Sequence, residues 1–432
     1  MDTILLAYPH KNGLYYQEVR NSSYVKWCGV VRDDGLYVYC VMDIRLEGFK
    51  ADPLTVSVTS PIEGRSAHMK LLVVAGARPN FVKIAPILKA LRRFPDVFEP
   101  RFVHTGQHYD ARMSQSFLDD LGIGAPDIAL GVGSGSHAVQ TARVMEAFEQ
   151  VVLQERPDRT LVVGDVNSTM ACALVCAKLG VPIDHVEAGL RSFDRTMPEE
   201  INRIVTDALS TLLFIHSPEG RDHLMREGVA PERIHFVGNV MIDCLIQCRP
   251  LIERSPVLDT LGLVAHEYAL LTLHRPANVD TEERLKALIA AISEIGSRIR
   301  IVFSVHPRTE KMIEQFGLLP LLTQIPGILR IDPQPYFDFV RLEQQARFVL
   351  TDSGGVQEET TFLGVPCLTL RSNTERPVTV SQGTSALVGS DTQVIVNHAG
   401  RILNDDWRPG TIPELWDGQA SDRIVEILMR QK

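Results

Sequence analysis

The feature that most constrains the fold is a repeated alternation of short apolar runs with longer helical stretches, which begins near Met69. Runs such as residues 71–75 carry almost no polar residue, which is typical of strands covered on both faces. Stretches with helical periodicity, such as residues 136–155, separate these runs. Strands that alternate with helices form parallel sheets, so the pattern predicts an α/β fold.

The strand-like runs fall into two series, and 432 residues exceed what one ordinary core holds. We therefore expect two Rossmann-like domains with parallel sheets, covering residues 69–238 and 239–417, with a hinge near residues 238–243. A last helix in residues 418–432 is expected to pack back on the first domain. The series comprise residues 71–75, 101–104, 160–163, 183–187 and 213–216, and then 234–237, 268–273, 301–305, 348–351 and 367–370.

Residues 1–68 differ from the rest of the chain. They carry aromatic residues and short β-like runs, but neither helical periodicity nor a chemical motif. We favour the hypothesis that translation starts at Met69. The alternative is that residues 1–68 form a small appended β module.

The charge and hydropathy of the chain exclude several classes of protein. The net charge of −9 argues against a general nucleic-acid binder, whose surface is basic. No apolar run approaches the roughly 18–20 residues that span a bilayer, and the N-terminus lacks the layout of a secretory signal. We expect a cytoplasmic protein that contacts neither nucleic acid nor membrane.

The chain has seven cysteines, and none forms a C-x-x-C motif. Two pairs, Cys172 with Cys176 and Cys244 with Cys248, are spaced four apart. Such a pair could hold a metal, but we interpret both as small apolar residues on helix faces. This cysteine usage fits a reducing compartment.

Two glycine-containing turns follow predicted strands and open helices, which is typical of phosphate-binding sites. The first turn begins at Gly76, and the side chains of Arg78 and Lys83 would add positive charge. The second contains Ser353, Gly354 and Gly355, with Glu359 about a turn and a half further on, within reach of a ribose. The simpler interpretation of the first turn is a surface arginine, and that of the second turn is a helix cap.

Acidic residues follow other strands or open a helix, which makes them candidates for general acids and bases. They are Asp165, Glu187 and Glu199. Each taken alone could be a helix cap or a surface charge. Together they indicate proton transfer.

Basic residues cluster after strands of the predicted second domain. His274 and His306 could bind a metal, but no third ligand stands at a suitable spacing, so we predict no metal site. Arginine presents a planar fork of donors that suits a diphosphate. We therefore expect these histidines and Arg376 to bind phosphate groups.

Taken in order, these segments resemble the non-hydrolysing UDP-N-acetylglucosamine 2-epimerases over residues 69–427. The resemblance implies the two-domain fold of B-type glycosyltransferases, with the active site in the cleft between the domains. It also implies interconversion of UDP-GlcNAc and UDP-ManNAc without a cofactor. The matching segments are Gly76-Ala-Arg-Pro-Asn-Phe-Val-Lys-Ile-Ala-Pro, Thr105-Gly-Gln-His-Tyr-Asp, Gly164-Asp-Val-Asn-Ser-Thr, His185-Val-Glu-Ala-Gly-Leu-Arg, Pro198-Glu-Glu-Ile-Asn-Arg, Thr351-Asp-Ser-Gly-Gly-Val-Gln-Glu-Glu and Thr374-Glu-Arg-Pro.

The resemblance also implies roles for individual residues. The catalytic group would comprise Asp165, Glu187, Glu199 and His274. The residues expected to bind UDP are Arg78, Lys83, Arg203, His306, Phe339, Ser353, Gly354, Gly355, Glu359 and Arg376, with Phe339 beside the uracil. Gln107 and His108 would hold a second nucleotide sugar.

One position departs from the family pattern, because Ala277 stands where many members have glutamate. The substrate could therefore be another UDP-HexNAc or a UDP-diacetamido-uronic acid. A B-type glycosyltransferase and a non-catalytic nucleotide-sugar sensor are the alternatives from other classes. A homodimer that supplies precursors for surface polysaccharide is the expected context.

Overall fold

The computed structural model describes residues 3–10, 13–20, 26–32, 35–41, 68–106 and 117–431, and of the first four ranges and Arg78 it describes only the backbone. The chain divides into two compact units, Met1–Met69 and Lys70–Lys432. In the first unit, β1 (Thr3–His10) pairs with β2 (Gly13–Arg20) and β3 (Lys26–Arg32) pairs with β4 (Gly35–Val41), both antiparallel.

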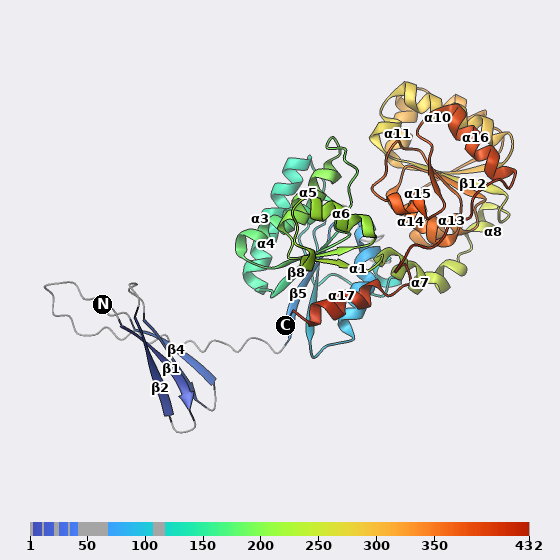
Figure 1. Cartoon of the computed structure of the whole chain (residues 1–432). Helices are drawn as coiled ribbons and strands as arrows, with labels where there is room; N and C mark the ends of the chain where they lie inside the picture. The colour runs from blue at the N-terminus through green and yellow to red at the C-terminus, as the bar shows by residue number, and fades with distance from the viewer. Residues whose placement is uncertain are drawn as a thin grey trace. The chain divides into compact units, whose positions relative to one another are not determined.

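The second unit contains two parallel sheets (Figure 1). The first sheet has seven strands in the order β11-β10-β9-β8-β5-β6-β7. Its strands are β5 (Met69–Ala75), β6 (Phe98–His104), β7 (Ile128–Ala129), β8 (Arg159–Val163), β9 (Ile183–Val186), β10 (Leu212–Ile215) and β11 (Ile234–Phe236). The helices between them are α1 (Arg78–Arg92), α3 (His137–Glu155), α4 (Asn167–Leu179), α5 (Pro198–Leu209), α6 (Pro218–Arg226) and the 3-10 helix η1 (Pro231–Arg233).

The second sheet has six strands in the order β14-β13-β12-β15-β16-β17, and all its pairs are parallel. Its strands are β12 (Tyr268–Leu273), β13 (Arg300–Val305), β14 (Ile328–Ile331), β15 (Phe348–Thr351), β16 (Cys367–Thr369) and β17 (Ser385–Leu387). Its helices are α8 (Val257–Leu261), α9 (Pro276–Val279), α10 (Glu282–Gly296), α11 (Pro307–Gln315), α12 (Leu319–Thr323), α13 (Tyr336–Gln344), α14 (Gly354–Leu363), α15 (Pro377–Ser381) and α16 (Thr392–Leu403).

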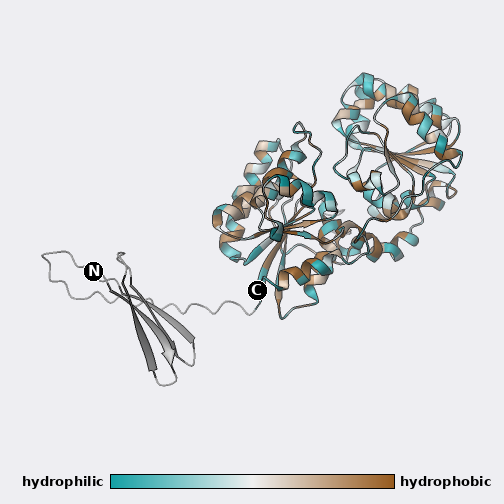
Figure 2. Ribbon diagram, viewed as in Figure 1, coloured by the Kyte–Doolittle hydropathy of each residue, from teal (hydrophilic) through white to brown (hydrophobic). Residues whose placement is uncertain are grey.

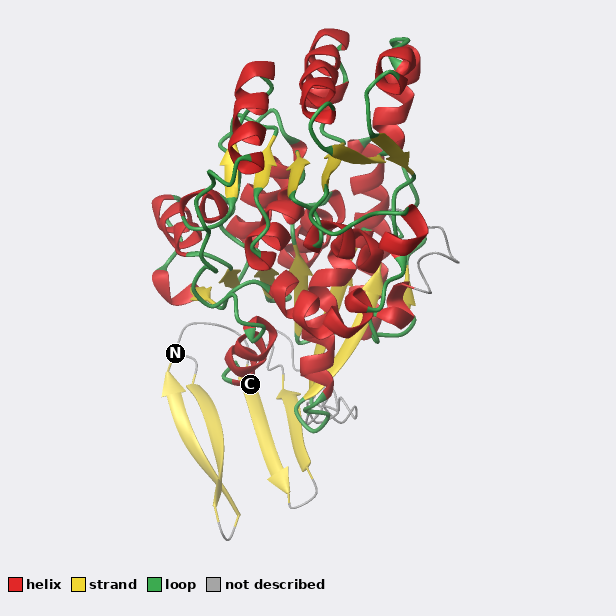
Figure 3. Cartoon of the chain, turned by 90° about the vertical axis from the view of Figure 1, so that its right-hand side faces the viewer, coloured by secondary structure: helices red, strands yellow, loops and turns green. Residues whose placement is uncertain are grey.

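The central strand β12 shows why the strands read as continuous apolar runs. Leu271 and Leu273 join a buried cluster with α10 and α16, whereas Tyr268 and Leu270 join a second cluster with α13 and α14. Successive side chains of a strand point to opposite faces, so both faces here need apolar residues. Figure 2 shows that many strands of the two parallel sheets are hydrophobic, and Figure 3 shows the helices that flank these sheets.

In each sheet the strand order reverses at the first strand, which is the topological switch point. In the first sheet β6 and β8 lie on opposite sides of β5, and in the second sheet β13 and β15 lie on opposite sides of β12. Ligands of such sheets bind beyond the carboxyl ends of the strands at this switch point. The loops that follow β5, β8, β12 and β15 are therefore the places where a site is expected.

The chain passes between the two sheets twice. It enters the second domain through α7 (Val240–Glu253), and it returns through Trp416 to α17 (Ala420–Met429), which packs against α1 and α7. The Asp243 carboxylate accepts hydrogen bonds from the main-chain N–H groups of Ala420 (3.1 Å) and Ser421 (2.7 Å). Buried Trp416 donates from Nε1 to the carbonyl of His216 at 3.0 Å.

The prediction of an α/β fold with two parallel sheets is confirmed, but the strand series needs correction. Strand β11 belongs to the first sheet, paired with β10, although its residues were predicted to begin the second series. Strands β7, β14 and β17 were not predicted, because they are short and not fully buried at the edges of their sheets. No helix in the described part is both long and apolar enough to cross a membrane.

Candidate active site

A cavity of about 760 Å³ lies between the two domains of the second unit. The first domain contributes His137 and the start of α5, and the second contributes the loops after β12, β13 and β16. The cavity therefore opens at the carboxyl ends of several parallel strands, as the topology predicts. Its polar and charged lining residues include His137, Asp194, Glu199, His274, Arg275, Asn278, Arg284, His306, Arg308, Arg371 and Asn373.

Glu187 occupies a strained position directly after β9. Its φ of 68° is in the left-handed region, which a non-glycine residue adopts only where the surroundings impose it. One carboxylate oxygen, Oε2, pairs with Nζ of Lys83 from α1, and both side chains are buried. The other oxygen, Oε1, is buried without a hydrogen-bond partner. The fold thus holds a carboxylate with one oxygen free for another group.

Gly164 makes room for this pair. Its φ of +68° favours glycine, and a Cβ there would lie 3.0 Å from Nζ of Lys83 and 3.3 Å from Oε2 of Glu187. Asn80 fixes the adjoining loop, because its amide donates to the carbonyl of Val163 at 3.2 Å. The ends of β8 and β9 and the start of α1 are thereby held together.

Asp165, at the end of β8, pairs with the guanidinium of Arg203 from α5. Burial alone would raise the pKa of Asp165, but the positive charges of Arg203, Lys83 and Arg376 hold that pKa below its ordinary value. Arg203 also binds Glu200 at 2.7 Å. The Asp165 carboxyl is therefore ionised at neutral pH.

Glu199 stands in the first turn of α5 and lines the cavity. Its Oε1 lies 3.3 Å from Nη1 of Arg275, which belongs to the second domain. The side chain is 37% exposed, which is far more than for Glu187. Glu199 can therefore meet a ligand that enters the cleft.

His274 follows β12 and is oriented by the buried carboxylate of Asp352, which follows β15. Its Nδ1 lies 2.8 Å from Oδ1 of Asp352, so Nδ1–H donates and Nε2 remains for another partner. Asp352 also accepts from the main-chain N–H of Arg275 (3.0 Å) and from the amide of Asn278 (3.0 Å). Sequence reasoning missed the role of Asp352, although its place after the neighbouring strand was the signal.

His306 follows β13, and its ring centre lies 5.7 Å from that of His274. Burial lowers the pKa of His306, and the nearby charges of His274 and Arg308 lower it further. Its Nδ1 accepts from the main-chain N–H of Arg308 at 3.2 Å, so the ring proton is on Nε2. His306 is therefore a neutral hydrogen-bond donor at the cleft.

The turn at Ser353–Gly355 opens α14 with main-chain N–H groups at the positive end of the helix. The guanidinium of Arg376 lies against Gly354, where any Cβ would collide with it. Arg376 is buried and pairs through Nε with Oε1 of Glu358 at 3.0 Å. A helix start and an arginine thus face the same point, which suits a phosphate group.

Glu359 is buried on α14 beside other acidic groups. Burial raises its pKa to about 8, and the charge of Glu358 adds to this effect, although Tyr336 opposes it. Glu343, on the adjacent helix α13, is fully buried with neither oxygen hydrogen-bonded, and burial raises its pKa as well. Glu359 is therefore mainly protonated at neutral pH.

Some predicted UDP-binding residues contact other protein groups, and some lie outside the described part. Lys83 pairs with Glu187 and Arg203 pairs with Asp165, and their binding to UDP stays a prediction. Phe339 packs against the apolar cluster beneath β12 and β15. Gln107, His108 and the side chain of Arg78 lie outside the described residues. Within the described ranges, no group of three or more histidine, cysteine and acidic side chains could hold a metal ion.

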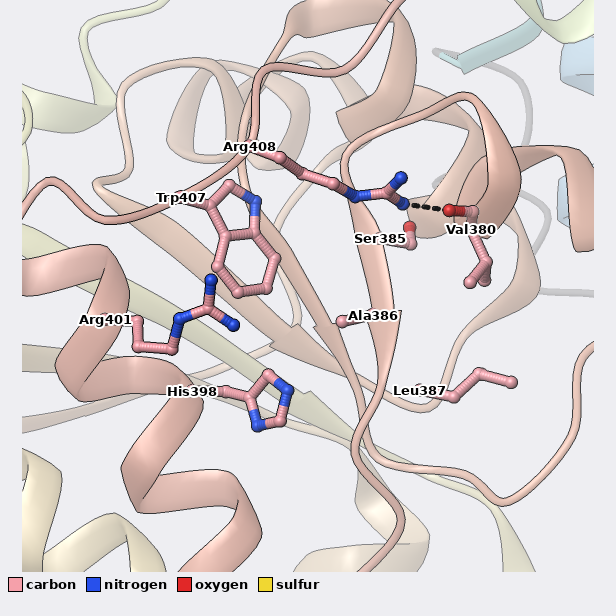
Figure 4. A pocket seen from close by; sticks show the side chains of 8 residues that line it. All are labelled: Val380, Ser385, Ala386, Leu387, His398, Arg401, Trp407 and Arg408. Carbon is pink, nitrogen blue, oxygen red and sulfur yellow. Dashed lines mark hydrogen bonds between the residues drawn. The ribbon is translucent and has the colours of Figure 1, made fainter.

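A smaller cavity of about 280 Å³ lies beside β17 and α16. Figure 4 shows the indole of Trp407 with the side chains of Arg401 and His398 next to it, and the hydrogen bond from Arg408 to the carbonyl of Val380. Arg401 is already paired with Asp406 at 3.0 Å. None of the predicted site residues lines this cavity, so the interdomain cavity remains the candidate site.

The interdomain arrangement suits proton transfer on an anionic substrate. Glu199 of the first domain lines the cavity with His274, Arg275 and His306 of the second, and Arg376 interacts electrostatically with Glu187 and Asp165. Such donors stabilise a leaving phosphate by fixed electrostatics. The carboxylates can remove a proton and return it.

Comparison with known proteins gives a consistent result. Residues 89–429 match the family model described as UDP-N-acetylglucosamine 2-epimerase. The UDP-N-acetylglucosamine 2-epimerase of Methanocaldococcus jannaschii is 41% identical, over 83% of this chain and 99% of that protein. Its crystal structure in complex with UDP-GlcNAc and UDP superposes with a TM-score of 0.76 and covers 84% of this chain and 100% of the other. The UDP-2,3-diacetamido-2,3-dideoxy-D-glucuronate 2-epimerase of Pseudomonas aeruginosa is 42% identical, over 84% of this chain and 100% of that protein.

Proposed function

Because the chain belongs to the UDP-N-acetylglucosamine 2-epimerase family, we propose that it interconverts UDP-GlcNAc and UDP-ManNAc by inverting C2. The observation that carries the proposal is the pairing of Glu187 with Lys83, which leaves one buried carboxylate oxygen free. Such an oxygen, held in a fixed place and shielded from water, is suited to exchange a proton with carbon. The enzyme is an isomerase in this proposal.

The chemistry requires UDP to leave first. The C2 hydrogen of a UDP-sugar is not acidic, because no carbonyl stands next to it. As the bond from C1 to the diphosphate breaks, the oxocarbenium-like ring makes that hydrogen acidic. A carboxylate takes the proton and the electrons of the C–H bond form the C1–C2 double bond, which gives 2-acetamidoglucal and UDP. Protonation of C2 from the opposite face and return of UDP to C1 complete the inversion.

The site residues divide between these tasks. Arg78, His306, Arg376 and the turn Ser353-Gly354-Gly355 would hold the diphosphate, with His274 near the leaving group. Glu359 would accept the ribose hydroxyls and Phe339 would lie beside the uracil. Asp165, Glu187 and Glu199 are the proposed acids and bases, and Lys83 and Arg203 would fix their charges. Closure of the cleft would keep water from the glucal.

Solvent exchange tests the proposed function directly. Incubation of the protein with UDP-GlcNAc in D₂O should place deuterium at C2 of both epimers. Proton NMR detects this as loss of the C2 proton signal. We expect turnover to persist in EDTA, since the proposal needs neither metal nor NAD. Epimerisation without deuterium at C2, or activity lost in EDTA, would contradict the mechanism.

The identity of the sugar is open to a specific alternative. The relative from Pseudomonas aeruginosa is named for a diacetamido-glucuronate substrate, and Ala277 removes a glutamate that many family members carry. The same NMR assay with a panel of UDP-HexNAc and UDP-diacetamido-uronic acid substrates ranks them. Net transfer of the sugar to an acceptor would instead identify a B-type glycosyltransferase.

We also propose that Gln107 and His108 hold a second UDP-GlcNAc that favours the closed cleft, and that the enzyme works as a cytoplasmic homodimer. The family resemblance supports both proposals. A ligand shifts such an equilibrium only by binding the closed form more tightly. The rate should then be sigmoidal in UDP-GlcNAc, and pure UDP-ManNAc should react poorly until UDP-GlcNAc is added. Gln107→Ala should weaken both effects, whereas hyperbolic wild-type kinetics would rule out the second site.

Size-exclusion chromatography with light scattering tests the proposed homodimer.

A further inference from the structure

Contacts between polar and charged side chains join the two domains at further points, in addition to the pair of Glu199 with Arg275. Nε2 of His216, just after β10 in the first domain, lies 3.1 Å from Oε1 of Glu358 on α14 in the second. Nη2 of Arg203, on α5 in the first domain, lies 3.8 Å from Oε1 of Glu375 in the second. The side chains of these two contacts are all buried.

Both of these glutamates also hold Arg376. Oε1 of Glu358 lies 3.0 Å from Nε of the guanidinium, and Oε2 of Glu375 lies 3.6 Å from Nη1. Nη1 is also the atom that lies against Gly354 at the start of α14. The guanidinium is therefore held between two carboxylates, with one edge turned to the proposed phosphate site.

Each carboxylate thus contacts both domains, and within the second domain Glu375 also accepts two hydrogen bonds from the guanidinium of Arg371, at 2.8 and 2.9 Å. Glu358 joins His216 to Arg376, and Glu375 joins Arg203 to Arg376. If the domains separated, the contacts of His216 with Glu358 and of Arg203 with Glu375 would be lost. Each glutamate would then keep only partners of its own domain. Partners that share a network of this kind depend on one another, because removing one changes the geometry of the rest.

We propose that Glu358 and Glu375 are positioning residues that align Arg376 with the leaving diphosphate only when the domains are closed. The proposal rests on the proposed function, in which Arg376 binds phosphate. In the open form the domain contacts of His216 and Arg203 are absent, so Arg376 is less fixed. Closure then completes the electrostatic site, and only then can the bond from C1 to the diphosphate break. The substrate therefore does not lose UDP while the cleft is open.

The cleanest test separates the domain contact from the arginine contact. His216→Leu removes only the first-domain partner and leaves the pair of Glu358 with Arg376 intact. We expect kcat to fall by about tenfold or more, on the scale of one charge-assisted hydrogen bond, while the Kd for UDP changes less than about threefold. His216→Gln, which restores a donor, should recover most of kcat. Glu358→Gln should weaken both kcat and UDP binding.

Glu310→Gln is the matched control, because Glu310 pairs with Arg330 at 2.6 Å within the second domain and outside this network. Its kcat and UDP affinity should equal those of the wild type. If His216→Leu keeps wild-type kcat, or if kcat and UDP affinity fall equally and His216→Gln restores neither, the proposal is wrong. Equal losses of that kind would indicate a purely structural contact.

A measurement that needs no turnover separates this proposal from the proposed function. Small-angle X-ray scattering with UDP should show contraction of the wild type and of Glu310→Gln, and a smaller contraction of His216→Leu. If the wild type fails to epimerise UDP-GlcNAc but these differences persist, the proposed reaction fails and the closure network stands. Equal contraction in all variants would overturn the network.

Discussion

At the scale of single residues, the candidate site depends on charges that are buried and matched. A buried carboxylate without a counter-ion is destabilising, so Lys83 stabilises buried Glu187, and Arg203 pairs with the half-buried Asp165. One oxygen of Glu187 has no hydrogen-bond partner, and a buried unsatisfied polar atom calls for an explanation beyond packing.

Glu187→Gln tests this at the site itself. The amide keeps the shape of the side chain but cannot take or return a proton. We expect turnover to fall by roughly 10²-fold or more, as loss of a general acid or base does, with UDP affinity nearly unchanged. Steady-state NMR kinetics and calorimetry with UDP provide the two measurements, and an unchanged rate would remove Glu187 from the proposed catalytic group.

The raised pKa of Glu359 predicts a pH dependence of UDP binding. With a pKa of about 8, the free protein carries a protonated Glu359 at neutral pH. Ribose hydroxyls donate best to the ionised form, so binding should release a proton at pH 7, and affinity should rise as the pH increases towards about 8 and then level off. Calorimetry in buffers of different ionisation enthalpy measures the proton release. Glu359→Gln should abolish the release, and a wild type that releases no proton would contradict the assignment.

At this scale the sequence predicted which residues gather but not how they pair. The motifs at strand ends and at the start of α5 predict one cleft, and His274 and Glu199 both line it. Asp352 and Glu358 were not predicted as partners, since His274 and His216 lie far from them along the chain. Pairing depends on side-chain directions across packed elements, which periodicity does not report.

At the scale of elements, long apolar strands and amphipathic helices were predictable, whereas short edge strands were not. Strand β12 is buried on both faces and therefore reads as an unbroken apolar run. Strand β14 is only half-buried along its length, so its residues alternate too weakly to be recognised. The same physical reason explains β7 and β17.

The start of α14 offers a test at this scale. Gly354→Ala introduces a methyl group where the guanidinium of Arg376 lies, so the arginine must move away from the helix start. We expect UDP affinity to fall by about tenfold or more, on the scale of a lost charge-assisted hydrogen bond, with little change in Tm. Gly364→Ala is an informative comparison, because its Cβ would meet no atom within 4 Å and its φ of +74° strains only the end of the helix. It should lower Tm and leave UDP affinity near that of the wild type.

At the scale of the whole molecule, the division into two compact units predicts that the second unit alone is active. The interdomain cavity and the ion-pair network use only residues of Lys70–Lys432. A protein that starts at Met69 should therefore fold and show the full kcat of the complete chain. Circular dichroism and NMR kinetics on both proteins measure this, and an inactive or insoluble shorter protein would show that residues 1–68 are required.

The return of the chain to its first domain has a consequence for synthesis. Helix α17 contains some of the last residues of the chain, yet it packs on α1 and is fixed by Asp243 of α7. A ribosome makes the first sheet long before it makes this helix. The first domain therefore completes its surface only after the second domain has been made, because the apolar side chains Ile424, Val425 and Leu428 reach their buried places last. Loss of α17 would leave the side chains of α1 and α7 that it covers exposed.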